Sequence, residues 1–177
     1  MASETHFQLF GLPARFALDA DALEKTWRAL AAQVHPDRYA TATAAERRVA
    51  MQWASAVNEA YRVLKAPLSR ARYLCELSGC DVQSESSVRM DNSFLMLQID
   101  LREQLDDARA SASPDALRAL ADDVAAMQAS LQAEVAELID HHQNYERACG
   151  KVREWMFIEK LVHEIQTSLA ELTDTPH

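Results

Sequence analysis

The stretch AAQVHPDRYATATAAERR, residues 31–48, decides how the first half of the chain folds. A helical pattern runs into it and stops at Pro36, because the proline ring disfavours helical geometry at His35. The tripeptide formed by His35, Pro36 and Asp37 therefore lies at the end of one helix and before another. Three roles are open for it: a simple turn, a catalytic or metal site, or a contact surface for another protein.

The segments on both sides of the tripeptide have helical signals. Asp21 and Glu24 resemble a capping box, and Thr43 and Glu46 form a T-x-x-E box. Each box is followed by an apolar stripe at helical spacing, Leu23, Trp27, Leu30 and Val34 in the first helix, and Val49, Trp53, Ala56, Ala60 and Leu64 in the second. We expect two antiparallel helices, joined by residues 35–42, with Trp27 and Leu30 facing Trp53 and Ala56.

The composition predicts an all-α fold. The chain has 3 Gly and 5 Pro, is rich in good helix formers, and has no run of alternating β-branched residues. Residues 67–79 read as a further helix, with Pro67 in its first turn and Gly79 at its end. We therefore predict a helical domain over residues 1–79, followed by a polar, Ser-rich linker over residues 80–91.

Residues 92–177 predict an antiparallel three-helix bundle. The first helix covers 92–110, and the second begins with Ser113 as cap and Pro114 at the first helical position. The second and third helices carry apolar residues at spacings of three and four, namely Leu117, Leu120, Val124, Met127, Leu131, Val135 and Leu138, and then Tyr145, Ala148, Val152, Trp155, Ile158, Val162, Ile165 and Leu169.

The helix over 92–110 has more apolar surface than a bundle core requires. On a wheel of about 100° per residue, Leu97, Leu101, Leu105 and Ala108 cluster with Phe94 as the core stripe. The opposite side mixes three large apolar residues with three carboxylates, Leu95, Met96, Ile99, Asp100, Glu103 and Asp107. Phe157 on the last helix likewise lies opposite its core stripe. Such a mixture is typical of a partner-binding surface, although burial between the two domains would also explain it.

Charge and cysteine content restrict the possible partners and compartment. Residues 1–79 hold 10 Lys+Arg and 8 Asp+Glu, and residues 80–177 hold 8 and 19, so the two halves carry +2 and −11. The acidic half argues against binding to nucleic acid or to an anionic membrane. The three cysteines are expected to be reduced, buried small hydrophobes. With no signal peptide recognised, we expect a cytoplasmic protein. No paired Cys/His cluster accompanies the cysteines, so we expect no metal site.

The sequence around the tripeptide resembles a J domain, the module that stimulates DnaK-type ATPases. The carrying features are the helix, HPD loop and helix over residues 21–64. The segments LFGLPARFALD (9–19), PLSRARYLCELSG (67–79) and FLMLQIDLRE (94–103) further resemble the HscB family of iron–sulfur co-chaperones. The resemblance covers nearly the whole chain and implies an N-terminal J domain followed by a three-helix bundle.

The resemblance implies a non-enzymatic adaptor without cofactor or metal. An HscA/DnaK-type ATPase chaperone would contact the HPD loop and a basic rim, His35, Pro36, Asp37, Lys25, Arg28 and Arg38. An IscU-type iron–sulfur scaffold would bind the surface formed by Leu95, Met96, Ile99, Asp100, Glu103, Asp107 and Phe157. The absence of a zinc-binding extension seen in eukaryotic relatives favours a bacterial protein.

Two positions depart from the family pattern, and two other functions compete. Asp100 stands where Glu is more common, and Val34 stands where J domains usually have an aromatic residue. A general J-domain co-chaperone would bind unfolded clients through its bundle, without a discrete site on residues 94–103. A metal-dependent hydrolase would use His35 and Asp37 as base or ligands, but no nucleophile motif or phosphate loop accompanies them.

Overall fold

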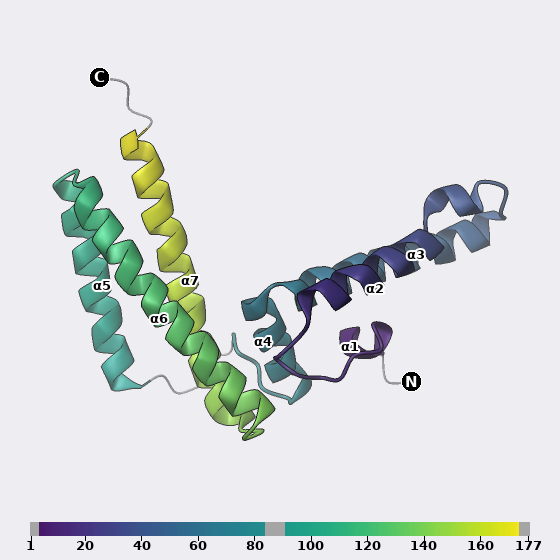
Figure 1. The fold of residues 1–177 in the computed structure, drawn as a ribbon, viewed down its shortest axis with the longest axis horizontal. Helices are drawn as coiled ribbons and strands as arrows, with labels where there is room; N and C mark the ends of the chain where they lie inside the picture. The colour runs from purple at the N-terminus through teal and green to yellow at the C-terminus, as the bar shows by residue number, and fades with distance from the viewer. Residues whose placement is uncertain (1–3, 84–90, 174–177) are drawn as a thin grey trace. The chain divides into compact units, whose positions relative to one another are not determined.

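The computed structural model describes residues 4–83 and 91–173 and, in these ranges, contains helices and no strands. The predicted all-α fold is therefore confirmed. The elements are α1 (His6–Leu9), α2 (Ala20–Gln33), η1 (Pro36–Tyr39), α3 (Ala44–Lys65), α4 (Pro67–Leu77), α5 (Asn92–Ala110), α6 (Pro114–Asp140) and α7 (Tyr145–Thr173) (Figure 1). Most of the predicted linker, residues 84–90, lies outside the described residues. None of the described helices is both long and apolar enough to cross a membrane.

The described chain forms two compact units, Met1–Leu74 and Cys75–His177. In the first unit, α2 and α3 pack against each other, with η1 between them in the chain (Figure 1). Thr43 and Glu46 form the predicted capping box at the start of α3. The cap of α2 differs from the prediction. Asp19, not Asp21, is the N-cap, and its carboxylate accepts hydrogen bonds from two backbone N–H groups of the first turn.

The predicted apolar stripe of α3 is partly wrong. Ala60 and Leu64 are buried as expected, but Val49 and Trp53 are 53% and 46% exposed. Ala50 and Val57 are buried in their place. Trp27 of α2 stacks on Tyr61, with ring centroids 4.5 Å apart, and donates its indole N–H to Asn58. The buried face of α3 thus comprises Ala50, Val57, Ala60 and Leu64, and the predicted stripe misplaced it by favouring the larger residues Val49 and Trp53.

Arg70 of α4 fixes the segment that leads into α2. Its guanidinium is buried and donates to the backbone carbonyls of Phe16 and Leu64, at 2.7 and 2.6 Å. It also lies 4.9 Å from the centre of the Phe16 ring. A buried charge with such partners is costly to leave unpaired, so Arg70 couples the entry of α2 to the end of α3.

The second unit contains the predicted three-helix bundle. Helices α5, α6 and α7 run side by side (Figure 1), and α5 has the predicted bounds. Ser113 caps α6, and Pro114 is the first residue of that helix, as expected. The core is formed by the predicted stripes, with Leu101, Leu105, Leu117, Val124, Val135, Val152, Trp155, Ile158 and Ile165 buried. Gly150 remains inside the continuous helix α7.

The cysteines agree only in part with the expectation of reduced, buried thiols. Cys75 is buried and free. Cys80 and Cys149, by contrast, are paired as a disulfide within the second unit, with Cα atoms 6.7 Å apart. The prediction was wrong for this pair because a separation of 69 positions gives no local signal of proximity, and only the packing of the chain brings the two residues together.

Candidate partner-binding sites

The HPD loop is a short, ordered helical turn. His35 is the N-cap of η1, and its ring Nδ1 accepts a hydrogen bond from the backbone N–H of Asp37 at 3.3 Å. The same nitrogen lies 3.6 Å from the Asp37 carboxylate. Pro36 is the first residue of this turn, a position that suits proline because its fixed φ matches helical geometry. The imidazole and the carboxylate are therefore held near each other by local backbone geometry.

Two residues after the tripeptide bind back to the end of α2. Arg38 donates to the carbonyl of Ala32 at 3.4 Å, and the Tyr39 hydroxyl donates to the carbonyl of Gln33 at 3.5 Å. These carbonyls belong to the last turn of the helix, where no intrahelical partner remains for them. The contacts anchor the loop, while the side chains of His35 and Asp37 stay 59% and 91% exposed. The loop therefore displays two polar groups on a fixed base.

The predicted basic rim is only partly assembled. Lys25 and Arg28 are exposed one turn apart on α2, and Arg28 forms a surface ion pair with Glu24. Arg38, in the adjoining turn η1, is exposed and donates to the carbonyl of Ala32 in α2.

Within the described residues, no group of three or more His, Cys, Asp or Glu side chains is placed to hold a metal ion.

An apolar hollow lies beside the HPD loop, between α2 and α3. Its volume is about 550 Å³, and Val34 and Tyr39, which flank the tripeptide, belong to its wall. The exposed side chains of Val49 and Trp53 complete that wall on α3. An aromatic side chain at position 34, which the J-domain pattern would place there, would fill part of this hollow.

The second face of α5 is exposed, as the helical wheel predicts. Leu95, Met96 and Ile99 are 44%, 68% and 56% exposed, which is unusual for side chains of this size. The carboxylates of Asp100, Glu103 and Asp107 are exposed around them. We call these six residues the apolar–acidic face.

Phe157 of α7 is less exposed than the residues of the apolar–acidic face. It is half-buried and makes an edge-to-face contact with the core residue Phe94, with ring centroids 5.8 Å apart. The guanidinium of Arg102 lies 5.7 Å from the centre of the Phe157 ring. Phe157 is thus one element of the contact between α5 and α7, with part of its surface still accessible.

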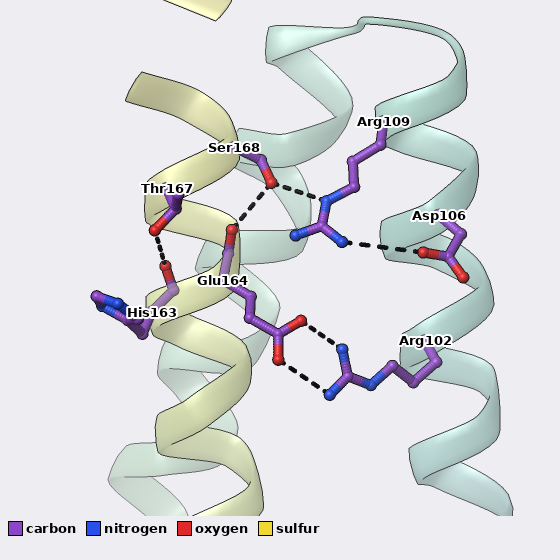
Figure 2. A network of polar contacts seen from close by, with 7 residues as sticks. All are labelled: Arg102, Asp106, Arg109, His163, Glu164, Thr167 and Ser168. Carbon is purple, nitrogen blue, oxygen red and sulfur yellow. Dashed lines mark hydrogen bonds and ion pairs between the residues drawn. The ribbon is translucent and has the colours of Figure 1, made fainter. Parts of the chain in front are cut away.

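A polar network fixes α5 against α7 (Figure 2). Arg102 donates to both carboxylate oxygens of Glu164, a bidentate pair, and Arg109 donates to the Ser168 hydroxyl at 2.8 Å. Hydrogen bonding to Arg102 lowers the pKa of Glu164, and the same bonds raise the pKa of Arg102. The apolar–acidic face therefore stands on a helix whose rotation is set by directional contacts.

The sequence analysis did not identify this network. Arg102 and Arg109 are seven residues apart, hence on one side of α5, and Glu164 and Ser168 are four apart on α7. That spacing is a usable signal that each pair shares a face. It does not reveal that the two faces meet, which depends on how the helices pack.

Comparison with known proteins places both surfaces in recognised domains. A DnaJ domain model matches residues 5–73, and a model described as the HSCB C-terminal oligomerisation domain matches residues 90–166. A co-chaperone protein HscB homolog of Bordetella parapertussis is 57% identical over 95% of this chain and 98% of its own length. The chain belongs to the HscB family of co-chaperones. A homolog from Paraburkholderia phymatum is 45% identical over 96% of this chain and 97% of its own.

Solved HscB structures have the same architecture. The chaperone HscB from Vibrio cholerae has a TM-score of 0.82 at 38% identity, covering 95% of this chain and 99% of that one. Human co-chaperone HscB has a TM-score of 0.86 at 24% identity, covering 94% and 83%, which speaks for the fold alone. The predicted HscB-family resemblance is confirmed. This chain is a J-domain co-chaperone, with the HPD loop in its J domain and the apolar–acidic face in its HscB C-terminal domain.

Proposed function

We propose that this co-chaperone brings an IscU-type iron–sulfur scaffold to an HscA/DnaK-type ATPase chaperone and stimulates ATP hydrolysis by that chaperone. Hydrolysis traps the scaffold and promotes transfer of its cluster to acceptor proteins. The chain itself hydrolyses nothing and needs no resident cofactor. We place it in the bacterial cytoplasm, with a J domain over residues 1–79, a linker over 80–91 and a scaffold-binding bundle over 92–177.

The display of the HPD loop supports the contact with the chaperone, and it is the observation that carries the proposal. Asp37 offers an exposed carboxylate to a cation on the ATPase, and His35 offers directional hydrogen bonding from a ring held by Asp37. Pro36 restricts the backbone, so little conformational entropy is lost on contact. Lys25, Arg28 and Arg38 supply exposed positive charge that favours encounter with an acidic surface.

The apolar–acidic face supports the contact with the scaffold. Leu95, Met96 and Ile99 lie within five residues on one helix, and their exposure to solvent adds no stability to an isolated co-chaperone. Their burial by a partner would supply affinity, and the surrounding carboxylates would favour a partner with basic residues beside its apolar patch. Phe157 extends this surface onto α7. Asp100 is already bonded to Gln104 at 2.9 Å, so its shorter carboxylate is oriented along α5.

Two binding surfaces on one chain explain how an adaptor accelerates the reaction. When the scaffold is bound to the bundle and the chaperone to the J domain, the encounter between scaffold and chaperone becomes intramolecular. The effective concentration of scaffold at the chaperone then rises above the bulk concentration of free scaffold. The adaptor thereby promotes capture without contributing a catalytic group.

The decisive experiment measures the ATPase rate of the purified chaperone with the co-chaperone, with the scaffold, and with both. We expect stimulation by the co-chaperone, greater stimulation with both, and loss of stimulation in His35→Gln. The control His142→Gln changes an exposed histidine in the second unit and should stimulate like the wild type. Equal stimulation by His35→Gln and the wild type would refute the role of the loop.

The general client-binding alternative makes a different prediction for the bundle. A co-chaperone for unfolded clients would bind a reduced, unfolded model protein, and that protein would compete with the scaffold. We expect scaffold binding to persist in an excess of the unfolded protein, because a discrete face recognises a folded partner. Full displacement of the scaffold would favour the alternative.

A further inference from the structure

Cys80 and Cys149 form a pair that the co-chaperone function does not use. Cys80 follows α4, and its backbone N–H donates to the carbonyl of Cys75 at 3.0 Å. Cys149 lies near the start of α7. Their Cα atoms are 6.7 Å apart, within the range of about 4.4–6.8 Å that disulfides span. Both residues belong to the second unit, Cys75–His177, so the pairing does not depend on how the two units are arranged.

The three thiols differ in access to solvent. Cys149 and Cys75 are both fully buried, whereas Cys80 is partly exposed. Burial raises the pKa of Cys75 to about 12, so its reactive thiolate is almost absent near neutral pH. A small disulfide arriving from solvent therefore meets Cys80 first, and Cys149 is the thiol placed to react next.

We propose that Cys80 and Cys149 are a reversible redox site, closed by a low-molecular-weight disulfide of the glutathione type. The Cys80 thiolate attacks one sulfur of oxidised glutathione, whose S–S bond breaks and releases one glutathione thiolate. The Cys149 sulfur then attacks the Cys80 sulfur, and the proton of the Cys149 thiol passes to the departing sulfur, which leaves as the second glutathione. Two protein thiols are oxidised to one disulfide, and one glutathione disulfide is reduced to two thiols.

Closing the bridge changes the stability of the bundle. The sequence separation of 69 positions encloses α5, α6 and the first turn of α7, which includes the apolar–acidic face. A crosslink around so long a loop restricts the unfolded chain strongly and stabilises the folded bundle. In a reducing compartment the site is open, and an oxidising challenge closes it. The site thus makes the rigidity of the partner-binding bundle depend on the thiol–disulfide balance.

The test uses the purified full-length chain and does not require the chaperone or the scaffold. After reduction, the chain is incubated with oxidised glutathione and analysed by intact mass, peptide mapping and thermal unfolding. We expect the loss of two hydrogen atoms, a linked peptide pair containing Cys80 and Cys149, and a rise in the unfolding temperature of about 5–12 °C. Reduced glutathione should reverse all three changes.

Single variants separate this proposal from non-specific oxidation. Cys149→Ser should accumulate one glutathione on Cys80, and Cys80→Ser should acquire neither bridge nor adduct. Cys75→Ala is the matched control and should close the bridge like the wild type. A linked pair that includes Cys75, a crosslink between two chains, or no reaction of Cys80 in Cys149→Ser would overturn the proposal. A bridged protein with unchanged unfolding temperature would refute the stabilising role.

Discussion

In the proposed function, the HPD loop and the apolar–acidic face present chemistry to their partners in different ways. The loop displays an imidazole and a carboxylate on a turn of four residues, fixed by its own backbone and by hydrogen bonds to the end of α2. The face on α5 spans about three helical turns and depends on a whole helix held by α6 and α7. A local surface is sensitive to single polar groups. An extended surface distributes its energy over several apolar side chains and over the contacts that orient them.

The largest effect is expected from truncating the apolar part of the face. The triple variant Leu95→Ala/Met96→Ala/Ile99→Ala removes apolar area that the bound scaffold would bury. This area is worth about 3 kcal/mol of binding free energy, so we expect the affinity for the scaffold to fall about 100-fold. Calorimetry or surface plasmon resonance with purified scaffold measures this. The thermal stability should be unchanged because these side chains are already exposed. Met51→Ala, on α3, removes an equally exposed apolar side chain and should bind normally.

A result in which the triple variant binds the scaffold with wild-type affinity would contradict the proposed site. In the proposed function, ATPase stimulation depends on the HPD loop and not on this face, so stimulation in the absence of scaffold should be retained. The two measurements together separate the surfaces.

The next effect in size concerns a single charge in the loop. Asp37→Asn keeps the shape of the side chain and removes its charge, which we expect to lower the affinity for the chaperone about 30-fold, or about 2 kcal/mol. A titration of ATPase stimulation against co-chaperone concentration reads this out. Asp21→Asn, an exposed carboxylate on α2, is the charge-matched control. Equal titration curves for wild type and Asp37→Asn would remove the carboxylate from the proposed contact.

A smaller effect is expected where the face depends on its supporting network. Glu164→Gln should cost about 1 kcal/mol of unfolding free energy, since the pair with Arg102 is partly exposed. Because the folded pKa of Glu164 is lowered, its contribution is present above the ordinary value of 4.5 and is lost as pH falls through the lowered pKa. The difference between wild type and variant should therefore shrink in acid, as measured by denaturant unfolding at several pH values. Asp122→Asn is the control, and a difference independent of pH would contradict this origin.

The smallest effect is expected under the HPD loop. Val34→Phe should fill part of the hollow lined by Leu30, Tyr39 and Trp53 and stabilise the first unit by about 0.5–1 kcal/mol. Val34→Ala should have the opposite sign, and thermal unfolding compares the two. If the larger side chain destabilises the protein, the hollow does not accept an aromatic ring at position 34, and this prediction is wrong.

Much of the architecture follows from local signals in the sequence. The Thr43–Glu46 box, the Ser113–Pro114 start and the bounds of α5 were predicted correctly because capping and helix breaking involve residues close together in the chain. The exposure of Leu95, Met96 and Ile99 also followed from the wheel, since only one side of α5 can face the bundle core. The roles of these residues in binding remain predictions.

Other features depend on which segments meet in space. Sequence periodicity favoured the large residues Val49 and Trp53 for the core of the J domain, but packing buries Ala50 and Val57, with Trp27 stacked on Tyr61. It likewise gave no sign that Arg102 meets Glu164 or that Cys80 meets Cys149. By itself, the sequence determined the helices, the HPD loop and the apolar–acidic face, because these arise from neighbours along the chain. The tertiary structure alone decided the buried face of α3, the support of α5 and the cysteine pair, because each requires close packing between distant residues.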